Sequence, residues 1–155
     1  MRHWLMKSEP DAYSIDHLAA DGTTHWDGVR NYQARNTMRD DMKVGDGVLY
    51  YHSQLKPPGV VGLARVVKEA YPDHTAWDPK SKYFDEKTDP KDPRWFMVDI
   101  GFVEKFDRMV SIDEMRQHSE LEEMVLLHRS RLSVQPVTDA EFAFIVDLAA
   151  RPAPA

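Results

Sequence analysis

The sequence WFMVDIGFVEKF, residues 95–106, sets the fold class of this chain. Its apolar side chains fall on alternate positions, at Phe96, Val98, Ile100 and Phe102. A period of two is typical of a β-strand, whose successive side chains point to opposite faces of a sheet. We therefore expect the longest strand of the protein here, and a fold that is organised around a sheet.

Other apolar stretches predict shorter strands on both sides of this one. They are bounded by turn signals or are rich in β-branched and aromatic residues, and they cover residues 3–7, 48–52, 60–67 and 132–137. Gly62 falls inside one of these strands, where a glycine often marks a bulge or the close approach of another backbone. Residues 72–93 contain four prolines and many charges, which predicts a long irregular excursion before the long strand.

Helices are expected where a capping residue precedes apolar residues at helical spacing. Ser14 is an expected N-cap, and residues 111–114 and 138–141 have the spacing of a capping box. Residues 31–42 carry an apolar stripe with a spacing of four, which predicts one amphipathic helix (Ala34, Met38 and Met42). Strands with short helices between them predict an α+β fold, which we expect to form a mixed β-barrel of about five to six strands.

Length and composition predict one domain outside the secretory pathway. The 155 residues suffice for a single core, expected over residues 1–150, with a disordered tail over 151–155. No cysteine is present, which excludes disulfide scaffolds and thiol catalysis. No apolar run approaches the length of a membrane span, and Lys7 interrupts the N-terminal run too early for a signal peptide. We therefore expect a soluble, cytoplasmic protein.

The charge balance argues against a protein that coats nucleic acid without specificity. Asp and Glu number 26 against 20 Lys and Arg, so the formal net charge is -6, whereas non-specific binding depends on many phosphate contacts. Residues 29–39 and 128–136, however, contain arginines and no acid. These two stretches could form a local basic surface or could simply be solvated faces of the protein.

Enzyme and cofactor motifs are absent from the sequence. There is no P-loop, no dinucleotide fingerprint, no Gly-x-Ser-x-Gly elbow and no pair of histidines at the spacing of a helical zinc site. A catalytic triad assembled from distant positions stays possible on composition. We expect no cofactor, no metal and no catalytic residues.

Several motifs, in order along nearly the whole chain, resemble the EVE domain family. They comprise residues 4–10 (WLMKSEP), 26–36 (WDGVRNYQARN), 51–53 (YHS), 62–64 (GLA), 67–73 (VKEAYPD), 95–99 (WFMVD) and 131–136 (RLSVQP). The resemblance implies a PUA-like barrel flanked by short helices. It also implies a non-catalytic module that binds a modified base of DNA or RNA.

The resemblance also implies an aromatic pocket for that base. Trp26 matches a cage tryptophan of related domains, and Trp77 is the nearest candidate for a second one. Stacking needs a flat apolar surface, and the base edge needs hydrogen-bonding groups. Strand ends converge at one mouth of a barrel, so we add residues at such ends and beside Trp26 to the expected pocket (Lys7, Ser8, Asn31, Tyr32 and Ser53).

Three arginines are expected to hold the nucleic-acid backbone, namely Arg30, Arg35 and Arg131. Plain structural roles compete with these assignments: Trp26 could be a core residue, Asn31 an N-cap and Arg35 the solvated face of a helix. We expect the protein to act as a monomer that contacts modified DNA or RNA and no membrane.

Two other classes of function stay open on the sequence. One is a small enzyme that resembles ASCH domains, an amidohydrolase or nucleoside-modifying enzyme with Lys7, Glu9 and His52 as acid–base groups. The other is a protein-interaction module that uses an exposed apolar patch. Turnover of modified nucleosides would indicate the enzyme, and pull-downs that survive nuclease treatment would indicate the interaction module.

Overall fold

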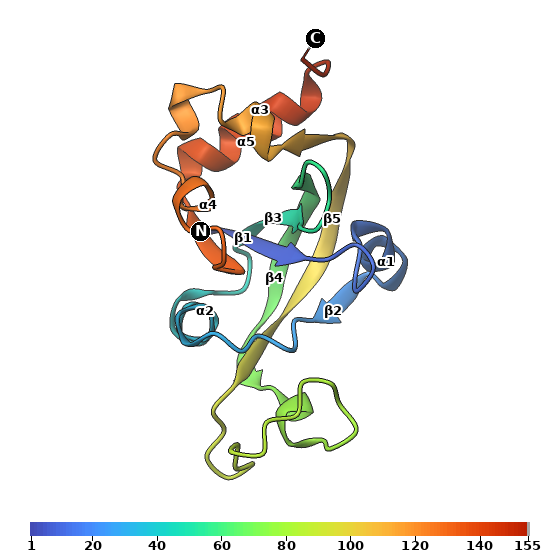
Figure 1. Cartoon of the computed structure of the whole chain (residues 1–155), viewed down its shortest axis with the longest axis vertical. Helices are drawn as coiled ribbons and strands as arrows, with labels where there is room; N and C mark the ends of the chain where they lie inside the picture. Colours follow the sequence, from blue (N-terminus) through green and yellow to red (C-terminus); the bar gives the residue numbers. More distant parts are fainter. Residues whose placement is uncertain (155) are drawn as a thin grey trace.

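A six-stranded mixed sheet forms the centre of the molecule (Figure 1), as described for residues 1–154 by a computed structural model. The strand order is β2-β5-β4-β3-β1-β6. The bounds are β1 His3–Ser8, β2 Thr23–His25, β3 Gly47–His52, β4 Gly59–Pro72, β5 Phe96–Ser111 and β6 Val134–Val137. Only β1 and β3 pair in parallel, and the other neighbours are antiparallel. The α+β class is therefore confirmed.

The sheet is not closed into a barrel, which corrects one part of the expected architecture. Within residues 1–154, the edge strands β2 and β6 do not pair with each other. Strand β2 has only three residues, and Pro136 in β6 has no backbone N–H for a further ladder bond. Both edges consequently have few backbone groups with which a closing strand could form hydrogen bonds.

Strands β4 and β5 form a long antiparallel ribbon that extends beyond the other strands (Figure 1). Residues 73–95 connect them as the expected irregular excursion, with one short 3-10 helix, η2 (His74–Trp77), and lie at the lower end of the molecule. Gly62 lies in β4, where a Cβ atom would collide with the carbonyl oxygen of Glu104 in β5. The prediction of a close backbone approach at Gly62 is confirmed.

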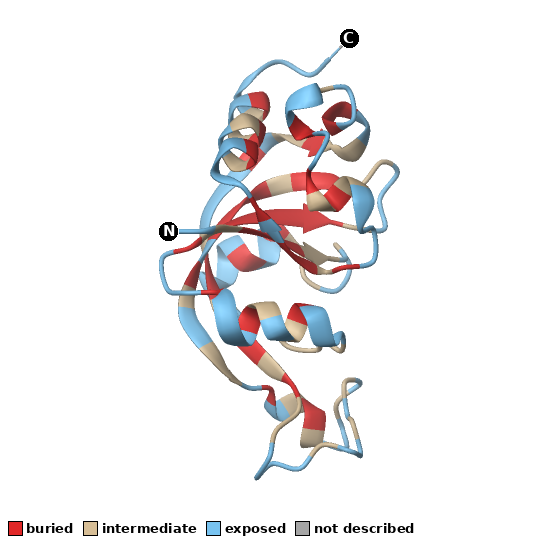
Figure 2. Cartoon of the chain, turned by 90° about the vertical axis from the view of Figure 1, so that its left-hand side faces the viewer, coloured by how far each residue is buried: buried red, intermediate tan, exposed pale blue. Residues whose placement is uncertain are grey.

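Each face of the sheet packs on its own hydrophobic cluster, because side chains alternate along each strand. Trp4 and Met6 belong to the first cluster and Leu5 to the second, and Tyr50 and Tyr51 divide in the same way. Buried residues accordingly run along the strands and the inner sides of the helices (Figure 2).

The helices divide between the two clusters, and α4 (Val125–His128) contacts both, since its Val125 packs against the first cluster. The first cluster contains residues of α1 (Ile15–Asp21), α2 (Tyr32–Asn36) and the π-helix η1 (Thr37–Asp41). The second contains residues of α3 (Ile112–Met115), the 3-10 helix η3 (Ser119–Leu121), α4 and α5 (Asp139–Ala150). The N-caps expected at Ser14, Ser111 and Thr138 are present.

The helix expected over residues 31–42 differs from the prediction in its hydrogen bonding. A short α-helix continues as a π-helix, and the backbone N–H of Met42 donates to the carbonyl oxygen of Thr37 at 3.2 Å. The predicted stripe is buried, with Ala34 and Met38 at 0% and Met42 at 1% exposed. The apolar spacing therefore identified the inward face, although it did not identify the wider turn.

The last helix of the chain ends before the C-terminal stretch that is rich in proline and alanine. Helix α5 ends at Ala150, and residues 152–154 have no regular structure and are exposed. The single domain over 1–150 and the disordered tail stay predictions, and Ala155 lies outside the described residues. No helix in the described chain is both long and apolar enough to cross a membrane.

Candidate nucleic-acid interface

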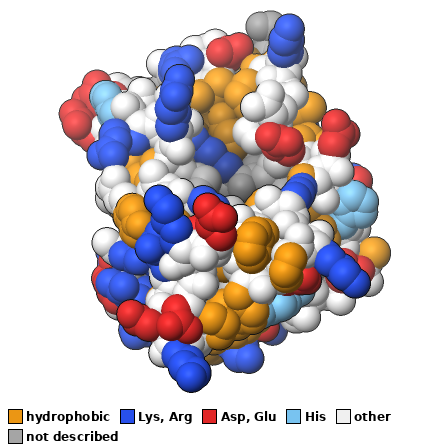
Figure 3. Space-filling model, turned by 60° about the horizontal axis from the view of Figure 1, so that its bottom comes forward, with side chains coloured by type: hydrophobic (Ala, Val, Ile, Leu, Met, Phe, Trp, Pro, Cys, Tyr) orange, Lys and Arg blue, Asp and Glu red, His pale blue; other side chains and the backbone are white. Residues whose placement is uncertain are grey.

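A cleft with a volume of about 710 Å³ opens beside the carboxyl end of β1. Five segments form it: the end of β1, the loop to α1, strand β2 with the turn after it, the excursion, and the residue before β6. The lining residues are Lys7, Ser8, Glu9, Ala12, Tyr13, Thr24, His25, Trp26, Asp27, Gly28, Lys82, Tyr83 and Ser133. The face turned toward the viewer in Figure 3 is hollowed, and Lys and Arg side chains lie in and around the hollow. This volume is in the range of small-molecule sites.

Trp26 forms part of the cleft wall and part of the core at the same time. Its backbone N–H donates to the carbonyl oxygen of Val98 at 2.8 Å, which anchors the turn to β5. Trp26 is 8% exposed, and its ring meets that of Tyr50 edge to face, with ring centroids 5.6 Å apart. Trp26 is thus packed in the core and is also one of the residues that border the cleft.

Tyr83 is a second aromatic residue of the cleft, and it comes from the excursion. Its ring lies over Gly28, whose φ is +79°, and a Cβ atom at Gly28 would lie 2.5 Å from that ring. Only glycine therefore permits both this backbone conformation and this contact. The expected second aromatic, Trp77, does not line the cleft within the described part of the chain.

The turn after Trp26 is tied to the excursion by a buried ion pair. Asp73 is fully buried and accepts hydrogen bonds from the backbone N–H of Gly28 at 2.8 Å and from Arg30 at 3.0 Å. It also accepts from the backbone and hydroxyl of Thr75. Burial acts to raise the pKa of Asp73, but these hydrogen bonds and the Arg30 charge outweigh it and lower the pKa.

Arg30 has its donors engaged within the protein. Besides Asp73, its guanidinium donates to the carbonyl oxygen of Tyr83 at 2.7 Å. It therefore joins the turn to the cleft-lining segment of the excursion. The geometry gives Arg30 a positioning role, while its expected contact with the nucleic-acid backbone stays a prediction.

Lys7 and Ser8 bring the end of β1 into the cleft, as expected. The ammonium group of Lys7 donates to the carbonyl oxygen of Ser130 at 2.7 Å, and burial lowers the pKa of Lys7. The hydroxyl of Ser8 donates to the carbonyl oxygen of Tyr13 at 2.8 Å. Ser53 does not line the cleft among the described residues, although its backbone N–H donates to the carbonyl oxygen of Ser8 at 3.1 Å.

A second, smaller hollow of about 270 Å³ contains Asn31 and the loop before β6. Its other lining residues are His128, Arg129, Ser130, Arg131 and Leu132. The side-chain oxygen of Asn31 caps α2 by accepting from the backbone N–H of Ala34 at 2.9 Å, so its amide nitrogen stays available as a donor. Lys7 connects the two hollows through Ser130.

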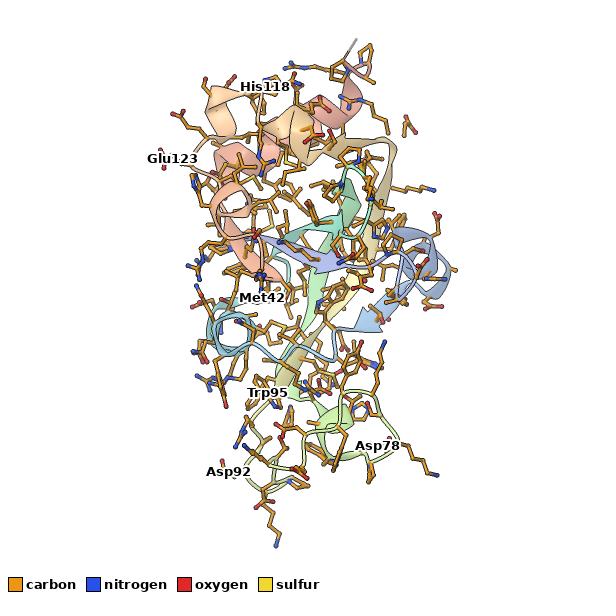
Figure 4. All side chains as sticks on the ribbon, viewed as in Figure 1. Met42, Asp78, Asp92, Trp95, His118 and Glu123 are labelled. Carbon is orange, nitrogen blue, oxygen red and sulfur yellow. The ribbon has the colours of Figure 1, made fainter. Side chains whose placement is uncertain are left out.

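Tyr32 and Arg35 lie outside the cleft, on an aromatic stack at the foot of the sheet. Tyr32 is 53% exposed and stacks on Trp95 with ring centroids 4.9 Å apart. The guanidinium of Arg35 lies 4.8 Å from the centre of the Tyr32 ring. Trp95 lies where the excursion rejoins the sheet (Figure 4). This stack is separate from the residues that line the cleft, so a pocket role for Tyr32 stays a prediction.

His52, the proposed acid–base group of the enzyme alternative, is engaged in the fold. Its Nε2 accepts from the backbone N–H of Ile15 at 3.3 Å, and its Nδ1 lies 3.3 Å from the carbonyl oxygen of Ser8. Burial lowers the pKa of His52, which favours the neutral ring. Lys7 and Glu9 line the cleft, whereas His52 does not within residues 1–154.

Sequence reasoning missed several residues of the cleft, including Tyr13, Asp27 and Tyr83. Asp27 follows Trp26 directly and could have been chosen for that position alone, whereas Tyr83 lies in a stretch without periodicity. Across residues 1–154, no group of three or more His, Asp or Glu side chains is placed to hold a metal ion.

Comparisons with known proteins agree along the whole chain. A family model described as EVE domain matches residues 2–148. Thymocyte nuclear protein 1 of Homo sapiens is 43% identical over 94% of this chain and 73% of that protein. A hypothetical protein from Leishmania major has a TM-score of 0.93 at 50% identity, over 96% of this chain and 94% of that chain. Human THYN1 protein in complex with 5-methylcytosine containing DNA has a TM-score of 0.94 at 41% identity, over 99% of this chain and 100% of that chain.

A likeness to the ASCH protein of Zymomonas mobilis is more distant. That structure has a TM-score of 0.56 at 10% identity, which shows a related fold alone. The ASCH-like enzyme alternative therefore has much weaker support than the EVE resemblance.

The expected cytoplasmic location is wrong. Curated relatives are named thymocyte nuclear protein 1, which points to a nuclear and not a cytoplasmic protein. The sequence reasoning had considered only a membrane span and a signal peptide. Neither feature distinguishes the cytoplasm from the nucleus.

Proposed function

Because this chain belongs to the EVE domain family, we propose that it is a reader of modified bases in DNA. One flipped base enters the cleft and stacks on Trp26, and the basic loop before β6 contacts the strand. The observation that carries the proposal is that Trp26, which packs on Tyr50 in the core, also borders a cleft of about 710 Å³. The similarity to a structure that contains 5-methylcytosine DNA supports a modified cytosine as the ligand.

The energetics explain why several parts of the site are needed together. Stacking on an aromatic ring contributes about 1–3 kcal/mol per base, and extraction of a base from a duplex costs a few kcal/mol. These two contributions nearly cancel, so phosphate contacts supply much of the net affinity. A methyl group that fits the pocket adds about 1–3 kcal/mol, which corresponds to selectivity of tens- to hundreds-fold.

We further propose that the protein binds without catalysis and that one chain is sufficient. His52 has both ring nitrogens engaged in the fold, which leaves Lys7 and Glu9 without the third acid–base group of the enzyme alternative. Catalytic amounts of protein should therefore leave modified nucleosides unconverted, and multiple turnover would contradict this part of the proposal.

An oligonucleotide array tests the proposed function. Short single- and double-stranded DNA and RNA, each with cytosine, 5-methylcytosine, adenine or N6-methyladenine at one position, are compared at fixed salt by fluorescence anisotropy. We expect DNA with 5-methylcytosine to bind at least about tenfold tighter than the same DNA with cytosine. Equal affinity for modified and unmodified bases would contradict the proposed reader function. Tighter binding of the RNA oligonucleotides than of the DNA oligonucleotides would indicate that the ligand is RNA.

Arg131→Gln tests the contribution of the loop before β6. Arg131 is exposed and lines the smaller hollow together with Arg129. Removal of one phosphate contact should weaken binding equally for methylated and unmethylated DNA and reduce the salt slope of log K by about 1. Arg65→Gln is the control, because this exposed arginine of β4 lines neither hollow within the described residues. An unchanged salt slope in Arg131→Gln would show that Arg131 does not contact the DNA backbone.

A further inference from the structure

Asp27 lies in the wall of the cleft, and its carboxylate accepts no hydrogen bond from another side chain among the described residues. It follows Trp26 directly, and its side chain is 30% exposed. The nearest basic group is Nε2 of His25 at 3.7 Å, which is longer than a hydrogen bond. Asp73 nearby contrasts with it, because Asp73 is fully buried and accepts from Gly28, Arg30 and Thr75.

A carboxylate at this place is unfavourable for contact with phosphate, because like charges repel. Burial raises the pKa of Asp27, with His25 acting in the opposite direction. The cleft therefore holds an acid whose charge is only partly compensated, and such a group gains from any donor that a ligand presents. A hydrogen-bond donor on a base edge meets this requirement, and a phosphate oxygen does not.

We propose that Asp27 accepts a hydrogen bond from the exocyclic amino group of the captured base, and so selects amino pyrimidines against keto pyrimidines. In 5-methylcytosine the group at position 4 is an amino donor, whereas in thymine it is a carbonyl acceptor. The two bases carry the same 5-methyl group, so stacking and the methyl contact do not separate them. This inference rests on the proposed function, since it requires a base in the cleft.

Three variants of single-stranded DNA test the inference on the full chain. One central position carries 5-methylcytosine, thymine or 5-methyl-2-pyrimidinone, which keeps the methyl group and lacks the amino group. Single strands are used so that differences in base pairing do not contribute. We expect the wild type to prefer 5-methylcytosine over thymine by about tenfold or more, the usual discrimination of a specific base-edge contact.

Asp27→Asn should reduce this preference to about twofold or less, because an amide both donates to a carbonyl and accepts from an amino group. Asp11→Asn is the matched control, since Asp11 is an exposed acid of the loop between β1 and α1, does not line the cleft within the described residues and should leave the preference unchanged. Thermal unfolding checks that each variant is folded. Should Asp27→Asn fail to fold, the wild type decides the matter, because 5-methyl-2-pyrimidinone must then bind about tenfold more weakly than 5-methylcytosine.

Two results would overturn the role of Asp27. In the first, Asp27→Asn keeps the full preference for 5-methylcytosine over thymine; in the second, the pyrimidinone binds as tightly as 5-methylcytosine. In either case a retained preference for 5-methylcytosine over cytosine leaves the reader function standing. Loss of that last preference in the wild type refutes the reader function itself, so the two failures are distinguishable.

Discussion

Trp26→Ala is expected to weaken binding to DNA with a modified base by about 5- to 150-fold, the equivalent of about 1–3 kcal/mol of stacking. Trp26 borders the cleft and is 8% exposed; its ring packs on Tyr50, and its backbone N–H bonds to β5. Residual affinity should be independent of the base and sensitive to salt, because it comes from phosphate contacts. Anisotropy titrations with methylated and unmethylated oligonucleotides measure both quantities.

The difficulty of this variant is that Trp26 also belongs to the first hydrophobic cluster. Truncation of a buried tryptophan costs about 3–5 kcal/mol of folding free energy. Met38→Ala is the matched control, since Met38 is fully buried in the same cluster and does not line the cleft among the described residues. Equal loss of base preference in both variants would mean that the effect comes from stability and would refute the stacking role.

Asp73→Ala is expected to lower the free energy of unfolding by about 3 kcal/mol, as for removal of one partner of a buried ion pair. The change leaves the Arg30 guanidinium, which is 23% exposed, and the backbone N–H of Gly28 without their acceptor. The turn after Trp26 then keeps the hydrogen bond from Arg30 to Tyr83 but loses the acid that holds both Arg30 and Gly28. Urea unfolding measures the stability, and the same oligonucleotide titration should show a weaker base preference because the position of Arg30, and with it that of Tyr83, is less well fixed.

The pH dependence of stability provides an independent signature of Asp73. Its pKa in the folded protein is lowered below the ordinary value of about 3.9. A lowered pKa stabilises the folded state above the unfolded pKa, and this contribution is lost as the pH falls through the folded pKa. Wild type should therefore lose more stability than Asp73→Ala below about pH 4.

Asp78→Ala is the control for both measurements, because Asp78 lies exposed in the same excursion (Figure 4) and accepts one hydrogen bond, from the backbone N–H of Lys80. We expect a cost of about 0.5 kcal/mol or less for such a surface change. A similar loss of stability in both variants would show that the excursion contributes generally and that the buried pair does not hold the cleft together.

The strands and caps were predictable because they depend on neighbours in the sequence. Alternation identified β5, and the capping residues Ser14 and Thr138 open α1 and α5 where they were expected. Strand β2 was missed because three residues carry too little pattern, and its pairing with β5 is a long-range contact. Closure of the barrel was wrong for the same reason, since edge pairing depends on distant strands.

In the candidate site, too, some residues were predictable from the sequence and others were not. Trp26, Lys7 and Ser8 were chosen from the sequence, and the structure brings all three to one cleft. Trp77 was chosen because the resemblance implies a second tryptophan in this stretch, but the path of the excursion places Tyr83 over Gly28. No periodic pattern within residues 73–95 could have predicted that path.

By itself the sequence determined the α+β class, the strand that became β5 and the tryptophan beside the cleft, because alternation, capping and the turn after Trp26 are local properties. The tertiary structure alone decided which second aromatic residue faces the cleft, and that Arg30 holds Asp73. The physical reason is that burial and hydrogen-bond partners arise from segments more than 40 residues apart, as the 43-residue separation of Arg30 and Asp73 shows.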